Sequence, residues 1–530
     1  MGNYSVIYYH YSINYLMNQT SRTTKSIHNT VVAMAFFVLM LLLQFVSRKV
    51  FLNYLGTEVL GLNTTLTNLL QFLNLAELGI GAAVGFSLYK PLANQSYAII
   101  NEIVTFHGML YRRIASYILI GGVVISAFFP LIFKKMNLPL WYAYASFGVL
   151  LVSALIGYYV NYRQIVLSSA QMDYKIQVAT VPRTLTKLVA QIAAMYCLPW
   201  PYESWIVLEL VFTLISAYSL HRATRNAFPE LQSTGHTFAE LKEKYRELLV
   251  KIRQLFFHRI GGFVMTQFSS IVIYAYISLT TVALYGNYML VGTGLIRLCN
   301  AMFNSMSAGV GNLVAEGDER HIREVFYELL SLRFAFVGML LYVMLLCFQP
   351  FISLWIGPEY LFGYSTVVLI VATLFISLTR NVVDQFINAY GLFGDIWAPV
   401  VEASLNVGLS VLFGWLFGLN GILFGVFVSL VVVVAMWKPF YLFSRAFKLG
   451  VWHYWSEWIR NSAALACAGV ASYYLLGSFL RLNPYQGWSE LVLFALVQGV
   501  AFAVFAAAFL LMFRTGFCLF VNRLTGRQIL

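Results

Sequence analysis

The chain has 530 residues, of which 60% are hydrophobic and only 10% are charged. A soluble domain carries roughly a quarter of charged residues, so this composition excludes an ordinary soluble globule and indicates a polytopic membrane protein. The formal net charge of +13 would suggest nucleic-acid binding in a soluble protein. Because no basic domain stands apart from the apolar segments, we interpret it as Lys and Arg in membrane loops, with no nucleic-acid partner.

Residues 1–28 are predicted to form a cytoplasmic N-terminal segment. Its first 25 residues are rich in Tyr and Asn and lack the apolar core and cleavage-like site of a signal peptide. A more uniformly polar run begins at Met17. We therefore expect translation to start at Met17, and residues 1–16 to be either disordered or misassigned to the protein.

Fourteen segments are candidate transmembrane helices, each with the roughly 20 mostly apolar residues that cross a bilayer. They are 29–51, 60–88, 112–133, 140–165, 178–198, 203–221, 255–277, 281–306, 328–350, 362–389, 398–417, 421–443, 459–480 and 489–513. An even number of spans places both termini on one side of the membrane. Most Lys and Arg residues fall in the loops of that side, which predicts cytoplasmic termini.

The longest polar connection, residues 222–254, has apolar and charged residues at helical spacing and is predicted to be an amphipathic helix on the cytoplasmic surface. The same order of helix pairs and loops occurs on both sides of it. This order indicates an N-terminal six-helix lobe (29–221) and a C-terminal six-helix lobe (255–443). Residues 444–530 would add two transmembrane helices and a cytoplasmic tail, giving an all-α polytopic membrane protein.

Ionisable side chains within the spans are candidate functional residues, because charge inside a membrane is costly and commonly serves transport. The candidates for binding substrate are the cations Arg48, Arg183, Lys187, Arg297 and Arg380. The candidates for ion coupling are the carboxylates Glu77, Asp384 and Glu402.

Several candidates also have a purely structural interpretation. A neighbouring helix could satisfy Glu77, which lies well inside the span 60–88 among small residues. Arg297 could form a buried salt bridge. Arg380 and Asp384 are four residues apart and can pair on one helix, and this pair could open when a proton or sodium ion binds.

Other charges lie closer to predicted span ends. Glu402 is about one turn into the span 398–417 and could face the lipid headgroups. Arg48, Arg183 and Arg333 could extend along the helix to the interface, although a bent first helix would instead turn Arg48 into a cavity. Lys187 lies nearer the middle of its span and shares a face with Arg183, so it needs an anion, a carboxylate or water.

The sequence contains no pattern typical of an enzyme. The five cysteines are scattered without a CxxC pair, the histidines lack metal-ligand spacing, and the glycine-rich phosphate loop of ATPases is missing. We therefore expect no catalytic residues, no metal site and no cofactor.

Four stretches resemble the Wzx-type polysaccharide flippases, a branch of the MATE-like (MOP) flippase superfamily. They are residues 47–93, 161–177, 282–291 and 381–429. The last stretch contains Glu402 and Asn406 four residues apart on one predicted helix, followed by the pattern Gly-x-x-Gly-x-x-x-Gly from Gly418.

This resemblance implies a fold of two six-helix lobes around a cationic central cavity that opens alternately to either side, in the bacterial inner membrane. The implied activity moves an oligosaccharide linked to undecaprenyl diphosphate from the cytoplasmic to the periplasmic leaflet, coupled to H+ or Na+. Polysaccharide assembly proteins are the implied partners. Intramembrane Arg and Lys are side chains suited to binding a diphosphate, so the charges within the spans agree with this cargo.

Two alternatives to a flippase stay open. An exporter of drugs or small cations from the same superfamily would favour an acidic cavity, whereas the candidate charges within the spans are more often basic than acidic. A membrane polymerase or acyltransferase would need a large outer loop, whereas the predicted outer loops are short. As a flippase, the protein should lose transport but keep its expression in Lys187→Ala and Arg297→Ala. The sugar composition, the coupling ion, and the choice among O-antigen of lipopolysaccharide, capsule and exopolysaccharide stay open.

Overall fold

A computed structural model describes residues 4–77, 79–170, 172–304, 306–392, 394–395, 397–479 and 482–526. Almost all of these residues are helical, and none of them forms a strand. Nine helical segments among them are long and apolar enough to cross a membrane. Each of the fourteen predicted spans overlaps a helix. The chain is therefore an all-α polytopic membrane protein, as its composition and apolar periodicity predicted.

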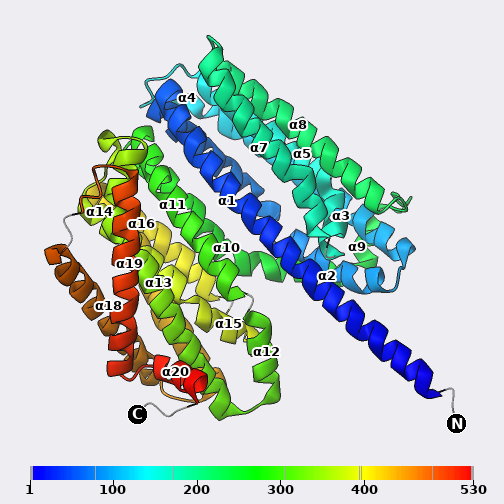
Figure 1. Ribbon diagram of the computed structural model, residues 1–530. Coiled ribbons are helices and arrows are strands. Elements are labelled where there is room, and N and C mark those ends of the chain that lie inside the picture. Colours follow the sequence, from blue (N-terminus) through cyan, green and yellow to red (C-terminus); the bar gives the residue numbers. More distant parts are fainter. Residues whose placement is uncertain are drawn as a thin grey trace. The chain divides into compact units, whose positions relative to one another are not determined.

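The chain divides into two compact units (Figure 1). Unit 1 contains residues 1–56, 81–127 and 144–249, and unit 2 contains residues 57–80, 128–143 and 250–530. The last boundary falls inside the segment 222–254 that we predicted as a linker between two lobes. Two short segments from the first half of the chain, 57–80 and 128–143, group with unit 2.

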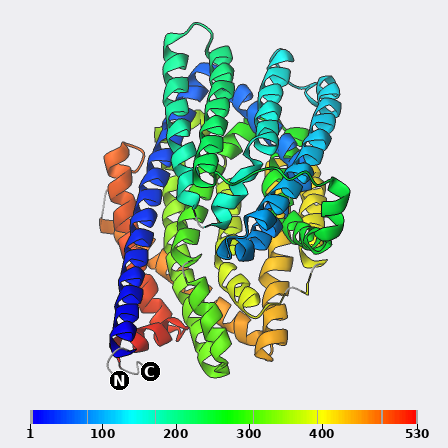
Figure 2. The same cartoon turned by 90° about the vertical axis from the view of Figure 1, so that its right-hand side faces the viewer.

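Unit 1 is a set of packed helices in which α7 and α8 form the main antiparallel pair, seen side by side in Figure 2. Its elements are α1 (Tyr4–Leu73) as far as Gly56, α2 (Ile80–Ala93), α3 (Tyr97–Ala127), α5 (Trp141–Tyr159), η2 (Asn161–Gln164), α6 (Ile165–Ser169), α7 (Asp173–Cys197), α8 (Pro201–Ala227), α9 (Phe238–Lys244) and the first residues of α10 (Arg246–Tyr276).

The first helix is longer than the sequence predicted. Helix α1 begins at Tyr4, so the backbone of residues 4–16 is helical, and the alternative of disorder is wrong for them. No Gly or Pro occurs between Tyr4 and Leu55, so nothing in the local sequence interrupts the helix. The break comes at Gly56, whose φ of 79° and ψ of 175° lie outside the helical region.

The predicted span 60–88 is not one continuous helix. Helix α1 ends at Leu73, a short 3₁₀ turn η1 (Asn74–Glu77) follows, and α2 starts at Ile80. Gly79 between them has a φ of 91°, and a Cβ there would lie 2.8 Å from the Leu255 Cβ. The small residues that we interpreted as a helix-packing surface thus mark an interruption, and half-buried Glu77 lies in that turn and not inside a regular helix.

The polar connection 222–254 does not form a single amphipathic helix. Helix α8 continues to Ala227, the seven-residue α9 packs on α3, and α10 begins at Arg246. Thr237 and Glu240 form a capping box that starts α9. The hydrogen bonds from Thr237 hold the pKa of the exposed Glu240 carboxyl below its usual value. This capping signal, which we overlooked, starts a helix that is separate from α8.

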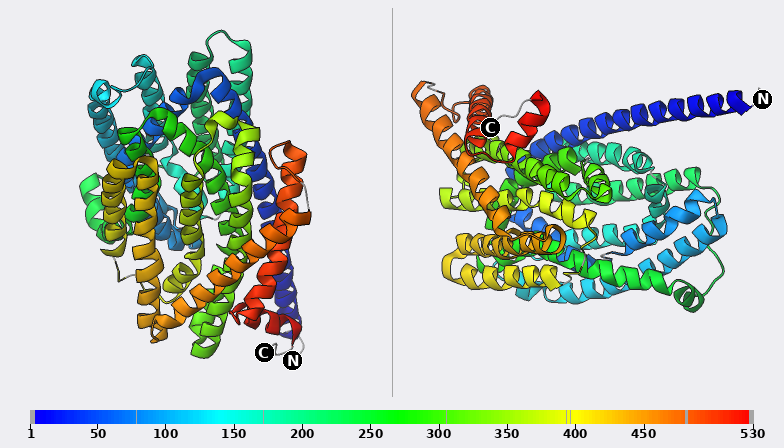
Figure 3. Two further views of the ribbon diagram at one scale, coloured as in Figure 1. Left: turned by 90° about the vertical axis from the view of Figure 1, so that its left-hand side faces the viewer. Right: turned by 90° about the horizontal axis from the view of Figure 1, so that it is seen from below.

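Unit 2 holds the C-terminal helices. Its further elements are α4 (Phe129–Ile132), α11 (Leu279–Asn304), α12 (Ser307–Glu316), α13 (Glu319–Trp355), η3 (Pro358–Tyr360), α14 (Tyr364–Thr379), α15 (Asn381–Ala389), α16 (Trp397–Ser429), η4 (Leu430–Trp437), α17 (Lys438–Leu442), η5 (Phe443–Phe447), α18 (Trp452–Phe479), α19 (Trp488–Met512) and α20 (Phe517–Thr525). Helices α18 and α19 pack on each other and on α13 (Figure 3).

The predicted spans 398–417 and 421–443 are present as the two arms of a helical hairpin. Within α16 the backbone reverses at Gly418, whose φ of 59° and ψ of −135° are incompatible with a continuous helix. After the turn, Gly425 lies so close to the first arm that a Cβ would be 2.5 Å from the Ser410 backbone nitrogen. The glycine pattern therefore lets two apolar arms approach to backbone contact.

A cluster of aromatic rings forms the core of unit 2. Phe326 on α13 is fully buried and contacts the rings of Phe386, Phe443 and Phe447 at centroid distances of 5.1 to 5.5 Å. Edge-to-face packing of this kind stabilises more than area burial alone. It joins α13, α15 and η5, and α15 also carries Asp384.

Buried carboxylates attach the C-terminal helices to α13. Glu457 on α18 accepts hydrogen bonds from Ser331 on α13 and from the Gly516 backbone before α20. Glu328 on α13 pairs with Arg523 on α20 at 2.6 Å. Helices α18 and α20 are thus fixed to α13 by polar contacts.

Candidate functional site

The central feature of unit 2 is an ion-pair cluster formed by Arg380, Asp384, Glu402 and Lys438, which we call the charge cluster. Arg380 lies at the junction of α14 and α15, and Asp384 is one turn further along α15. The Arg380 Nε lies 2.9 Å from the Asp384 Oδ2. The predicted pair of these residues on one helix is therefore confirmed.

Lys438 is the member of the charge cluster that sequence reasoning missed. Its Nζ lies 2.7 Å from the Asp384 Oδ1, and its side chain is only 17% exposed. It lies near the end of the predicted span 421–443. Its position within that span could have identified it as a candidate, because a cation inside the membrane needs a partner.

Glu402 faces the interior of unit 2 and not the headgroups, which corrects one interpretation of the sequence. It is 4% exposed, and its Oε1 lies 3.6 Å from the Arg380 Nη1. This separation exceeds a hydrogen bond, and Oε1 accepts none from a described residue. Successive turns of α16 bring Asn406 and Ser410 onto the same buried face.

Asp384 and Glu402 therefore differ in how their charge is compensated. Asp384 has two cations within 3 Å, whereas Glu402 has one at 3.6 Å. Two cations and two carboxylates make the ionised charge cluster neutral. A carboxylate held by a single long contact is the group whose charge state is easiest to change without opening the rest of the cluster.

Arg333 on α13 is fully buried and does not extend to the interface, so the interfacial interpretation is wrong. Its Nε donates to the Leu378 carbonyl at 2.5 Å, and its guanidinium lies 4.6 Å from the centre of the Phe303 ring. Its Nη1 and Nη2 make no hydrogen bond with the described residues. The side chain is 0% exposed, so it has no contact with water.

Unit 1 contains a second ion pair within apolar helices. The Lys187 Nζ on α7 lies 2.7 Å from Glu209 on α8, and both side chains are about one-fifth exposed (19% and 22%). Gln191, one turn along α7, donates to the other carboxylate oxygen at 3.0 Å. The predicted need of Lys187 for an anion or carboxylate is met by Glu209, a carboxylate within the predicted span 203–221 that we overlooked.

The remaining candidates lie apart from these pairs. Arg48 is half-buried on α1, and Arg183 on α7 donates to the Val178 carbonyl of its own helix at 2.8 Å. Arg297 on α11 is exposed and makes no ion pair or hydrogen bond with a described residue, so the buried salt bridge is wrong for it. The structure thus brings together Arg380, Asp384 and Glu402 from the predicted set.

The ion pair with Glu209 corrects the expectation that Lys187→Ala keeps its expression, because removing Lys187 should harm the fold before it harms transport. In Lys187→Ala, Glu209 loses its cation but keeps Gln191, which should cost about 2 kcal/mol of unfolding free energy. We expect a lower yield of folded protein in detergent, measured by size-exclusion chromatography. Lys187→Met combined with Glu209→Gln should recover much of that yield. A full yield for Lys187→Ala alone would show that the pair is not structural.

An apolar groove lies along unit 2 between α11, α13 and α19. Its volume is about 900 Å³, and its lining consists entirely of apolar side chains and one glycine. Leu295, Met344 and Val500 are examples from the three helices. A groove of this size and chemistry accommodates a flexible hydrocarbon chain.

Solved structures of two membrane proteins share this architecture. The lipid II flippase MurJ in an inward closed conformation aligns with a TM-score of 0.65 at 12% identity, covering 91% of this chain and 99% of that one. An inward-facing multidrug resistance MATE family transporter of the MOP superfamily aligns with a TM-score of 0.54 at 14% identity, covering 78% and 98%. This is the MurJ and MATE fold. No protein-family model and no curated protein sequence matches the chain.

The MurJ and MATE fold agrees with the architecture of the superfamily that the sequence resembles. Identities of 12% and 14% bear on the fold and not on the cargo. The Wzx-type branch, the oligosaccharide cargo and the roles of the charged residues therefore depend on the chemistry of this chain.

Proposed function

We propose that the protein is a flippase of the Wzx type, which moves an undecaprenyl-diphosphate-linked oligosaccharide from the cytoplasmic to the periplasmic leaflet by alternating access. It acts in the bacterial inner membrane with both termini in the cytoplasm, alongside polysaccharide assembly proteins. An H+ or Na+ gradient drives it through Asp384 and Glu402. Glu77 is a further candidate for coupling.

The observation that carries this proposal is the unpaired Arg297. It lies on α11, within the candidate membrane span Leu279–Asn300, yet no described carboxylate neutralises it. A guanidinium at membrane depth requires an anion, and its planar fork matches the oxygens of a diphosphate. Arg48 and Arg183 are the corresponding candidates in unit 1, whereas Lys187 and Arg380 are already engaged with carboxylates.

The apolar groove of unit 2 supports a lipid-linked cargo. An isoprenoid tail needs a continuous hydrocarbon surface, which the lining residues of α11, α13 and α19 supply. A small water-soluble drug would need no such groove. The likeness to a MATE family transporter makes drug export the alternative outcome of the test.

The test is a gene deletion complemented with variants. We expect complete undecaprenyl-diphosphate glycans to accumulate on the cytoplasmic face of the deletion strain, and the intact gene to reverse this. Arg297→Ala should reduce export at least tenfold, as expected when one charge-assisted contact of about 1.4 kcal/mol or more is lost, with unchanged protein levels. Arg246→Ala, which changes an exposed Arg at the start of α10, is the matched control.

Three results would contradict the proposal. Unchanged lipid-linked glycans together with reduced dye efflux would assign the protein to drug export. Complete units that reach the periplasm but stay unpolymerised would assign it to polymerisation. Normal export by Arg297→Ala would remove Arg297 from the binding site.

A further inference from the structure

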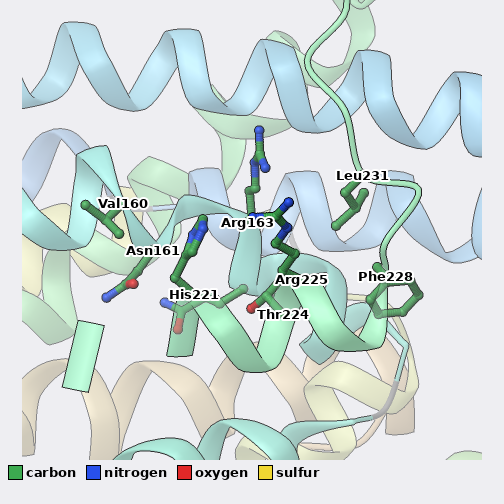
Figure 4. A pocket seen from close by; sticks show the side chains of 9 residues that line it. Val160, Asn161, Arg163, His221, Thr224, Arg225, Phe228 and Leu231 are labelled. Atoms are coloured by element: carbon green, nitrogen blue, oxygen red, sulfur yellow. The ribbon is translucent and has the colours of Figure 1, made fainter. Parts of the chain in front are cut away.

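A small pocket with a cationic lining lies at one end of unit 1, where α5 and α8 both finish (Figure 4). Its polar lining comes from Asn161, Arg163 and Gln164 on η2 and from His221, Thr224 and Arg225 on the last turns of α8. Figure 4 shows the side chains of Arg163 and Arg225 extending to the same side, with His221 next to them. We call it the arginine pocket.

The two guanidinium groups of the arginine pocket have no carboxylate partner among the described residues. Arg163 donates only to neutral oxygens, those of Tyr162 at 3.1 Å and Ser233 at 3.3 Å. Arg225 is exposed and makes no ion pair or hydrogen bond with a described residue. The lining contains no Asp or Glu.

Two other carboxylates of unit 1 are engaged away from the arginine pocket. Glu102 on α3 pairs with Lys244 at 2.6 Å and lies 3.6 Å from His236. Glu240 on α9 accepts from the Thr237 backbone as part of its capping box. Convergent cations without a carboxylate repel one another, and an anion placed between them would remove that repulsion.

The walls of the arginine pocket are held in place by contacts that do not involve the cations. The connection after α8 is fixed to α3, because Asn101 donates to the Glu230 carbonyl at 3.0 Å and Thr105 accepts from the Thr234 backbone at 3.0 Å. Tyr162 of η2 packs against Gly108 of α3, where a Cβ would come within 2.8 Å of its ring. The two arginines of the pocket therefore project from backbone segments that other contacts hold in place.

Size and position indicate which anion fits. The pocket volume of about 10 Å³ is room for about one water-sized group, so a phosphate oxygen can enter but a sugar or an aromatic ring cannot. Helices α5 and α8 are both candidate membrane spans, and the pocket lies where they end. Phosphates of lipid headgroups lie at this level, between hydrocarbon and water.

We infer that the arginine pocket binds the phosphate of an anionic phospholipid headgroup from the surrounding membrane. Arg163 and Arg225 donate to phosphate oxygens, and the His221 ring supports them as a neighbouring donor. The acyl chains lie outside the pocket, along the helices. The site is independent of the transported cargo, since it fixes a membrane lipid to the end of α8 whatever molecule the protein moves.

The experiment measures lipid binding to the purified full-length protein in detergent by native mass spectrometry. The probes are phosphatidylglycerol, zwitterionic phosphatidylethanolamine, and inorganic phosphate. Phosphatidylglycerol should bind the wild type more tightly than phosphatidylethanolamine. Arg163→Gln or Arg225→Gln should each raise its Kd about tenfold, the loss of one charge-assisted contact, and the double variant about a hundredfold.

The control is Arg222→Gln, an exposed arginine on α8 that does not line the pocket, and it should leave the Kd unchanged. Because Arg163 also bonds to Ser233, Arg225→Gln alone decides the result if Arg163→Gln fails to fold. Equal binding of phosphatidylglycerol by wild type and Arg225→Gln would overturn the inference. So would equal binding of the two lipids by the wild type. Inorganic phosphate that displaces phosphatidylglycerol at equal concentration would assign the pocket to free phosphate, and the lipid assignment would fail.

Discussion

Asp384→Ala is expected to lower the free energy of unfolding by about 3 kcal/mol, because removing one partner of a buried ion pair leaves uncompensated charge. Asp384 lies within 3 Å of both Arg380 and Lys438, so its loss leaves two cations at membrane depth. Its 22% exposure keeps the effect at the lower end of the range for buried pairs. Titration with SDS in mixed micelles, followed by circular dichroism, measures the change.

A second substitution separates uncompensated charge from lost packing. Adding Lys438→Met to Asp384→Ala removes one of the two unpaired cations and should recover more than half of the loss. The matched surface control is Glu324→Ala, which breaks an exposed pair with Arg320 and should cost under about 1 kcal/mol. If Asp384→Ala costs no more than Glu324→Ala, the charge cluster does not hold α15 and α17 together.

The parts of this structure that were predictable from sequence are those set by local rules. Apolar length gave the helices, and the hairpin at Gly418 followed from two apolar runs around a glycine turn. The contact between Arg380 and Asp384 was predictable because a spacing of four places two side chains on one helical face. None of these inferences needs information from distant parts of the chain.

Partners from other helices were not predictable in the same way. Glu402 was predicted to lie near the start of its helix, but its approach to Arg380 depends on how α16 packs on α14. Whether Arg333 reaches the interface or lies over Phe303 is decided by its neighbours, since sequence position is the same in both cases. Lys438 and Glu209 were missed although each lies within a predicted span.

The prediction for the segment around Glu77 was wrong because its glycines were interpreted only as helix-packing residues. The segment around Glu77 was expected to be a packed, continuous helix because it is rich in small residues. Gly79 instead takes a φ of 91° and ends the helical run, while Gly425 does serve close packing within the hairpin. Both uses rest on the missing Cβ, and only the fold selects between them.

Glu402→Gln is expected to uncouple transport from the ion gradient while leaving the fold intact. Glutamine has the shape of a protonated glutamate, so the substitution fixes the neutral state of the carboxylate that has only one cation, at 3.6 Å. A gradient can bias a conformational equilibrium only through a group that binds the ion unequally in two states. In proteoliposomes under a gradient, the flipping rate of Glu402→Gln should therefore fall at least tenfold, to the rate measured without a gradient. A tenfold loss of rate corresponds to about 1.4 kcal/mol.

The comparison with Asp384→Asn identifies which carboxylate carries the coupling. Asp384 is fixed by two cations, so its substitution should reduce folding as well as transport, whereas Glu402→Gln should keep the wild-type yield. Gradient-dependent flipping by Glu402→Gln would show that this carboxylate does not take the ion. Coupling would then have to act through Glu77 in η1, the other predicted carboxylate, and Glu77→Gln would be the decisive variant.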